Sequence, residues 1–402
     1  MTRRSSSARS SLLLLSVALI LGMSTWFSAS AVIPQLEPVW DLDATSKAWL
    51  TIAVQLGFVV GALASAALNL SDILAPRLII AAGGIGAGLA NLALLAMGTA
   101  GGGITLRFLT GFFLAGVYPP AFKQISTWFQ QGRGMAMGTL VGSLILGSAL
   151  PHLVNALGGV HWESVIVTTT AFSLVGGLAA LGVGDGPYPF PTASFDPRQI
   201  SQVFRNRGVR LASIGYFGHM WELYAMYAWF TVFTSDHLAV VDEPALPTAA
   251  FITFAVIAAG FPGSYLGGIL SDRWGRSKTT SLLLGLSGAC SVGIGFLFGG
   301  PTWLLVSVGL VWGLTVVADS AQFSAIVTEV GDQSYVGTAL TMQLAIGFSI
   351  TVITIWVIPF LETAIGWRWA FSILALGPLV GIVAMQRLRR LPESALIAGG
   401  RG

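Results

Sequence analysis

Charged side chains are scarce in this sequence, and an intramolecular disulfide cannot form in it. Only 9% of the 402 residues are Asp, Glu, Lys or Arg, whereas soluble domains carry about 25%. The one cysteine, Cys290, lies in an apolar run, which favours a small buried side chain. Metal-ligand clusters, phosphate-binding glycine loops and nucleophile motifs are also missing. These absences argue against a soluble enzyme, a metal or cofactor protein and a nucleic-acid-binding protein.

Long apolar runs dominate the sequence instead, and 54% of its residues are hydrophobic. Twelve runs approach the ~20 residues that a helix needs to cross a bilayer. Each run is continuously apolar rather than alternating, which predicts helices and not barrel strands. The sequence therefore predicts an all-α polytopic membrane protein. The predicted spans are residues 11–33, 48–70, 78–97, 104–129, 135–157, 165–183, 209–233, 249–270, 279–298, 303–328, 336–361 and 369–385.

The twelve spans form two sets of six that look related. NLSDILAPR, around Asp72, returns in the second half as ILSDRWGRS, around Asp272, and the GTL at Gly138 is echoed by the GTAL at Gly337. Such internal repeats are typical of transporters. The predicted domains are an N-terminal six-helix bundle, a cytoplasmic linker and a C-terminal six-helix bundle, at residues 1–184, 185–208 and 209–402.

Basic residues gather on one side of the predicted topology. If both termini are cytoplasmic, all but three of the twenty Lys and Arg fall in inside segments; the exceptions are Lys47, Arg107 and Arg368. The positive-inside rule then predicts a multi-pass protein of the inner (plasma) membrane with cytoplasmic termini. The first span can also be read as a cleaved signal peptide, but its removal would leave an odd number of spans.

Two segments resemble the major facilitator superfamily (MFS). GILSDRWGRSK, from Gly268 to Lys278, is similar to the family's cytoplasmic G-x-x-x-D-R-x-G-R-x-K loop. RFLTGFFLA is similar to the family's R-x-x-x-G-x-x-x-A pattern through Arg107, Gly111 and Ala115. The resemblance covers essentially the whole chain. It implies the MFS fold, with twelve transmembrane helices in two pseudo-symmetric bundles.

A third segment, from Gly116 to Gly138, resembles the branch of nitrate, nitrite and cyanate porters. The middle of the second and eighth spans lacks the arginine with which nitrate porters hold their anion. Drug/proton antiporters of the superfamily usually carry a Gly-Pro pair in the fifth span, and Pro151 does not follow a glycine. The resemblance therefore leaves the solute open.

The resemblance also implies a cytoplasmic gate. A carboxylate in such a loop can cap a helix of the opposite half, so Asp272 would hold the gate shut near the fifth span and Asp72 near the eleventh. The expected gating residues are Asp72, Arg77, Gly268, Asp272, Arg273, Gly275 and Arg276.

Four ionisable residues fall within predicted spans, namely Arg107, His219, Glu222 and Asp319. A charge in hydrocarbon costs at least about 2.5 kcal/mol, so each needs a partner or a function. Glu222 lies one helical turn from His219, and this pair could form a proton site. Arg107 could contact an anion or pair with an acid, and Asp319 lies in a short polar run. For each, a structural hydrogen bond or ion pair is the alternative.

A stripe along the seventh span adds aromatic and hydroxyl groups to this set, and the alternative is that these rings only pack between helices. The candidate substrate-binding residues are Arg107, Tyr216, His219, Tyr227 and Trp26. The candidate proton-coupling residues are Glu222, His219, Asp319 and Arg107.

The sequence thus predicts a secondary active transporter that moves a small anionic or zwitterionic solute by alternating access, with proton symport preferred. The alternatives are a proton-coupled efflux antiporter of small organic compounds and a non-transporting receptor with the same fold. An enzyme is not expected. The expected partners are the solute, protons and the lipid bilayer, and the expected state is a monomer without cofactor, metal or nucleic acid.

Overall fold

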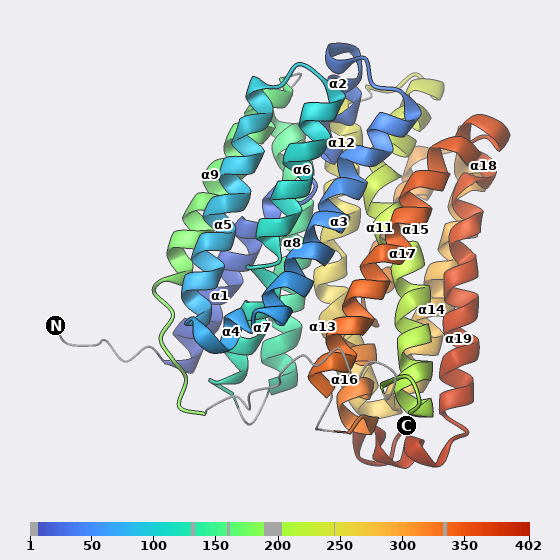
Figure 1. Ribbon diagram of the computed structural model, residues 1–402. Helices are drawn as coiled ribbons and strands as arrows, with labels where there is room; N and C mark the ends of the chain where they lie inside the picture. Colours follow the sequence, from blue (N-terminus) through green and yellow to red (C-terminus); the bar gives the residue numbers. More distant parts are fainter. Residues whose placement is uncertain (1–6, 130–132, 159–160, 189–202, 245, 333–335) are drawn as a thin grey trace.

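The computed structural model describes residues 7–129, 133–158, 161–188, 203–244, 246–332 and 336–402, and every regular element within these ranges is helical. The helices run side by side in one elongated bundle, with the N-terminal half on the left and the C-terminal half on the right of Figure 1. The all-α fold predicted from the apolar runs is confirmed.

The N-terminal half contains six spans, and the first is broken near its middle. That span comprises α1 (Ala8–Gly22), the 3-10 turns η1 (Met23–Thr25) and η2 (Ser30–Val32), and α2 (Ile33–Trp40). The other helices are α3 (Ala44–Ala67), α4 (Leu70–Ile73), α5 (Pro76–Leu92), η3 (Ala93–Ala96), α6 (Ala100–Leu114), α7 (Tyr118–Ser126), α8 (Arg133–Gly158) and α9 (Trp162–Ala180). The fourth span breaks between α6 and α7, where Pro119 and Pro120 lack the N–H groups that would continue α6.

The C-terminal half repeats this plan. Its spans are α11 (Arg207–Val240), α12 (Leu246–Ala258) with α13 (Gly260–Trp274), α14 (Arg276–Gly293) with η5 (Ile294–Leu297), α15 (Thr302–Val316) with α16 (Ser320–Val330), α17 (Val336–Ile365), and α18 (Trp367–Ala370) with η6 (Phe371–Ala375) and α19 (Leu376–Leu388). A last turn, η7 (Pro392–Gly399), follows α19. The tenth span breaks between α15 and α16, in the same relative place as the fourth.

Eleven helical segments of the described chain are long and apolar enough to cross a membrane. The helix α11, with 34 residues, is not among them, and it carries ionisable side chains at Arg207, His219, Glu222 and Asp236. It packs beside α12, α17 and α19, which is consistent with the predicted twelve-span arrangement. It begins at Arg207, one residue before the end of the predicted linker, and residues 189–202 of that linker lie outside the described residues.

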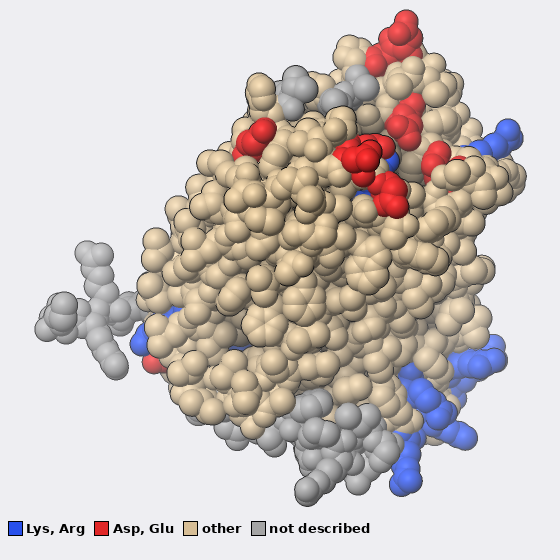
Figure 2. All heavy atoms as spheres, turned by 45° about the horizontal axis from the view of Figure 1, so that its top comes forward, with Lys and Arg blue, Asp and Glu red and all other residues tan. Residues whose placement is uncertain are grey.

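Charge divides the two ends of the bundle. Figure 2 shows acidic side chains at the end that is uppermost in Figure 1 and basic side chains at the opposite end. The exposed acids include Glu37, Asp41, Asp43, Asp242 and Glu243, and this end is called the acidic end. The exposed arginines include Arg207, Arg210, Arg387, Arg389 and Arg390, and theirs is called the basic end.

The two halves meet along α8 against α12 and α13, and along α3 against α17. On α8, a Cβ at Gly142 would lie 2.6 Å from the Phe261 ring of α13, so the helices touch there. One turn nearer the basic end, a Cβ at Gly138 would meet nothing within 4 Å, and the same holds for Gly268, two turns beyond Phe261. Contact between α8 and α13 therefore stops short of the basic end.

Toward the acidic end the halves remain joined. Nδ1 of His152 on α8 lies 3.0 Å from the hydroxyl of Thr231 on α11, and both side chains are buried. The halves are thus in contact toward the acidic end, whereas Gly138 and Gly268 face open space nearer the basic end.

Candidate functional site

The guanidinium of Arg107, on α6, is fully buried and bound to main-chain carbonyls. It donates to the carbonyls of Thr25 (2.8 Å), Trp26 and Leu50 (3.4 Å), and to the hydroxyl of Ser28 (3.0 Å). The first span is not regular α-helix from residue 23 to 32, so several of its carbonyls lack a helical donor. Arg107 supplies donors at this break and ties the fourth span to the first and second.

Asn91, on α5, extends this network to the third and sixth spans. Its side-chain oxygen accepts from Ser28 (2.6 Å), and its NH2 group donates to the carbonyl of Ile166 and the hydroxyls of Thr169 and Thr170. Among the described residues, every hydrogen-bond partner of Arg107 is neutral. The expected ion pair of Arg107 with an acid is therefore not formed in this structure, and an anion contact stays a prediction.

A second buried group of charges lies in the C-terminal half. Nδ1 of His219, on α11, is 2.9 Å from Oδ1 of Asp319, and both side chains are at most 1% exposed. Asp319 stands at the break between α15 and α16, where it precedes the first residue of α16. The His219 ring also packs beside Tyr216 and Phe323, each at 5.9 Å between ring centroids.

The pair is close but not aligned as a hydrogen bond. Among the described residues, neither ring nitrogen of His219 and neither carboxylate oxygen of Asp319 has a hydrogen-bonded partner. Buried polar groups are nearly always satisfied, so four such atoms together mark a place for water, a proton or a solute.

Glu222, on α11, has partners of its own. The hydroxyl of Ser287, on α14, donates to Oε2 at 2.8 Å, and the indole N–H of Trp312, on α15, donates to Oε1 at 2.7 Å. The prediction that Glu222 pairs with His219 is therefore wrong, because His219 contacts Asp319 instead. Glu222 still joins the seventh, ninth and tenth spans in the same bundle.

Aromatic rings from both halves meet at the junction of the halves. The Trp26 ring of the first span lies 4.9 Å from Phe58, 5.8 Å from Tyr224 and 5.6 Å from Phe348, between centroids. We call these four residues the aromatic cluster. Tyr227, one turn beyond Tyr224 on α11, packs against Phe27. Two candidates, Trp26 and Tyr227, thus lie at the junction of the halves, while Tyr216 lies beside His219.

Several polar atoms around the aromatic cluster are buried without a partner among the described residues. They are the indole N–H of Trp26, the hydroxyl of Tyr227, both amide atoms of Gln55 and the amide nitrogen of Gln343. Gln55 is one turn from Phe58 on α3, and Gln343 is about one turn from Phe348 on α17. Sequence reasoning missed both glutamines and three rings of the cluster, although a lone Gln in an apolar run is a detectable signal.

The expected gating residues do not form a contact between the halves here. Arg276 binds Glu329 (2.8 Å) and Gln322 (2.5 Å), both on α16 of its own half. The carboxylate of Asp272 is exposed, with no hydrogen bond or ion pair to any described residue. Among the described residues, Asp272 therefore makes no contact with the opposite half, and its gating role stays a prediction.

The remaining gating residues divide between exposed and buried positions. Arg273 is exposed, and Gly275 is buried at φ +93°, a conformation that favours glycine. Arg77, at the start of α5, donates to the carbonyl of Val183 (3.4 Å) within the N-terminal half. The side chain of Asp72 lies outside the part of the chain that the structure describes.

The family model described as "Major Facilitator Superfamily" matches residues 14–351. The chain belongs to the Major Facilitator Superfamily. It is thus a polytopic membrane protein of a transporter family.

Two curated members of the superfamily are similar to this chain. "MFS-type transporter pytF" of Aspergillus terreus is 27% identical over 42% of this chain and 56% of its own length. "3-(3-hydroxy-phenyl)propionate transporter" of Escherichia coli is 28% identical over 37% of this chain and 36% of its own length. The matches thus span about half and about a third of these relatives.

Solved MFS structures share the fold at low identity. A "D-xylose-proton symporter" superimposes with a TM-score of 0.75 at 15% identity, covering 97% of this chain and 99% of that one. A bacterial homologue of the human lysosomal transporter Spinster, in an "inward-facing and unoccupied conformation", gives 0.69 at 14% identity, covering 96% of each chain. At these identities the likeness shows the fold.

Proposed function

We propose that this protein is a proton-coupled symporter that carries a small anionic solute by alternating access. The observation that carries the proposal is the contact of His219 with Asp319, buried at a helix break beside the rings of Tyr216 and Phe323. A titratable pair at such a break is the arrangement in which transporters bind a proton or an ion.

The pair offers a direct way to link the proton to the anion. While Asp319 is ionised, it neutralises a protonated His219 at 2.9 Å. A proton added to Asp319 removes this negative charge and leaves the imidazolium free to attract an anion. Proton binding and anion binding then strengthen each other, and by thermodynamic linkage each does so equally. This reciprocity is what symport requires.

The neighbouring groups favour an anion with a ring. The aromatic cluster offers ring faces, and Trp26, Tyr227 and Gln55 offer hydrogen-bonding atoms without partners among the described residues. The Escherichia coli relative is named for an aromatic carboxylate, 3-(3-hydroxy-phenyl)propionate. We therefore favour an aromatic or other small organic carboxylate, with a zwitterion as the next class. The likeness of residues 116–138 to nitrate porters makes nitrate the inorganic anion to compare.

The proposal also assigns each end of the bundle to one side of the membrane. Basic segments stay in the cytoplasm, so the basic end faces inward, with both termini on that side of the inner membrane and the protein acting as a monomer. The parting of Gly138 and Gly268 and the free Asp272 then describe an inward-open state. The rest of the cycle would close this end and open the acidic end by rocking of the halves.

Proteoliposomes that contain the purified protein test the proposal. With an inward proton gradient, we expect several-fold accumulation of a labelled aromatic carboxylate such as 3-phenylpropionate. Asp319→Asn should lose this accumulation and keep exchange of labelled for unlabelled solute, because the amide cannot take up a proton. Glu222→Gln is the matched control, since it changes another buried acid of the same bundle to its amide.

Each result that differs from these expectations would contradict a different part of the proposal. Solute expelled by an inward proton gradient would replace symport with antiport. Binding without exchange for aromatic carboxylates, other organic anions, zwitterions and nitrate would point to a receptor. Unchanged accumulation in Asp319→Asn would remove the proton site from this pair.

A further inference from the structure

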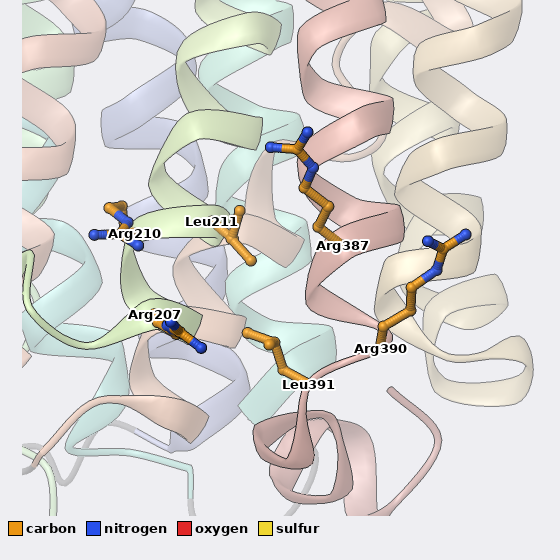
Figure 3. Close-up of a pocket in the computed structure, with 6 residues that line it drawn as sticks. All are labelled: Arg207, Arg210, Leu211, Arg387, Arg390 and Leu391. Carbon is orange, nitrogen blue, oxygen red and sulfur yellow. The ribbon is translucent and has the colours of Figure 1, made fainter.

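Four arginines and two leucines line a cavity at the basic end of the C-terminal half. Its volume is about 350 Å3, at the small end of the range for ligand sites. Figure 3 shows Arg207, Arg210 and Leu211 at the start of α11 on one side of the space, and Arg387 of α19 with Arg390 and Leu391 just after this helix on the other. The two helices pack against each other, so the six side chains surround one space. We call this space the arginine pocket.

The charge of the arginine pocket is unbalanced. All four guanidinium groups are exposed, and none has a hydrogen bond or ion pair with any described residue. Arg276, at the same end of the bundle, does bind an acid, Glu329. Arginine stays charged in proteins, and like charges repel most strongly beside a low-dielectric protein surface. Four of them around one cavity therefore favour an anion as the occupant.

An apolar stripe leads along α19 to this pocket. Four side chains at helical spacing are 47–58% exposed on one face of the helix, namely Leu376, Leu379, Val380 and Val383. The same spacing continues to Arg387 and Arg390, so the stripe and the two arginines share a face. A soluble anion needs the arginines alone. A lipid needs both the charged site and an apolar surface that runs from it into the bilayer.

We propose that the arginine pocket binds the phosphate headgroup of an anionic phospholipid, whose acyl chains lie along the stripe of α19. Guanidinium groups bind phosphate through two parallel hydrogen bonds, and basic pockets between transmembrane helices hold such headgroups. The leucines at the floor, Leu211 and Leu391, suit the glycerol and upper acyl carbons. The inference does not depend on the transported solute.

Binding here would act on the helix that carries the proposed transport site. Arg207 and Arg210 begin α11, and His219 and Glu222 follow on the same helix within about four turns. A bound phosphate would hold the basic ends of α11 and α19 together and so stabilise the folded C-terminal half.

Native mass spectrometry of the purified protein, exchanged into phosphatidylglycerol or phosphatidylcholine, tests the proposal. We expect one retained phosphatidylglycerol and no retained phosphatidylcholine. Arg387→Gln/Arg390→Gln should lower the retained phosphatidylglycerol at least fivefold. The matched control is Arg205→Gln/Arg389→Gln, which removes two exposed charges from the same end outside the pocket and should retain the lipid.

Equal retention by the pocket variant and the control would overturn the proposal, because the lipid would then follow general charge. A rise in Tm with inorganic phosphate equal to that with phosphatidylglycerol would overturn it too, since a soluble anion would suffice. If the first variant does not fold, Arg207→Gln/Arg210→Gln reports on the same pocket from α11, with the same expected loss.

Discussion

Arg107 in the N-terminal half and the His219–Asp319 pair in the C-terminal half differ in how completely their buried polar atoms are bound. In the N-terminal half, the guanidinium of Arg107 is bound by carbonyls and polar side chains of three neighbouring spans. In the C-terminal half, Asp319 and His219 touch each other and have no further hydrogen-bonded partner among the described residues. A cation that stays charged and whose donors are all bound is suited to a structural role, in which it holds neighbouring spans in one arrangement. Side chains that are incompletely bound suit a part of the protein that changes conformation.

Arg107→Met should give the largest effect on stability. It leaves the carbonyls of Thr25, Trp26 and Leu50 without this donor, and a buried acceptor left unsatisfied costs about 1–3 kcal/mol. We expect a marked fall of Tm in detergent, with partial recovery in Arg107→Lys. A variant with the wild-type Tm but no solute binding would reverse the comparison and make Arg107 part of the solute site.

His219→Gln should have the second-largest effect. It should lower the affinity for the solute rather than the stability of the folded protein. Removal of the imidazolium takes away the proposed anion contact and leaves Asp319 to repel the solute. We expect at least tenfold weaker binding of the aromatic carboxylate, which is about 1.4 kcal/mol. Calorimetric titration measures this, with Tm as the control for folding. Unchanged affinity would mean that the solute binds elsewhere.

Glu222→Gln should have a smaller effect. The amide oxygen can still accept from the Trp312 indole, and its NH2 group can donate to the Ser287 hydroxyl, so we expect a loss of at most about 1 kcal/mol. Proton-driven uptake should stay within about threefold of wild type, with a threefold rate change being about 0.65 kcal/mol. Loss of accumulation with intact exchange would move the proton site from Asp319 to Glu222.

The smallest effect is expected outside the spans, at the start of α3. The Asp43 carboxylate accepts from the backbone N–H of Ser46 (2.7 Å), and hydrogen bonds from Ser46 lower the pKa of Asp43 from its usual 3.8. This interaction of ionised Asp43 therefore stabilises the folded protein at pH values above the pKa that Asp43 has in the unfolded chain. The stabilisation is lost as the pH falls through the lower pKa of Asp43 in the folded protein. Asp43→Ala should lower Tm slightly at pH 7, and the difference should vanish in strong acid. A difference that is constant with pH would exclude this interaction as its cause.

The fold could be predicted from the sequence because the prediction depends only on composition and on the spacing of residues along the chain. Apolar runs of bilayer length predict spans wherever they occur, and the Asp272 loop carries the family pattern locally. The buried ionisable residues were also visible, since each interrupts such a run. The contact of His219 with Asp319 could not be predicted from the sequence, because it depends on how the seventh span is rotated against the tenth.

The surroundings of Arg107 were hidden for a different reason. Its partners are mainly carbonyls, which every residue has, so they leave no mark in the sequence. The break in the first span, which exposes these carbonyls, does have a signal in the sequence. Ser24, Thr25 and Ser28 each donate to a carbonyl three residues earlier, and such local bonds compete with regular helix. The resemblance to nitrate porters, carried by a different segment, gave no information on this region.

The binding of Arg107 to the first span has a consequence for synthesis of the protein. The carbonyl of Trp26 is made 81 residues before the guanidinium that binds it. Until the fourth span enters the bilayer, the irregular stretch of the first span has no such donor, and unpaired main-chain groups are strongly disfavoured in lipid. We expect the first span to insert as a more regular helix and to acquire its final shape only once the fourth span has been translated.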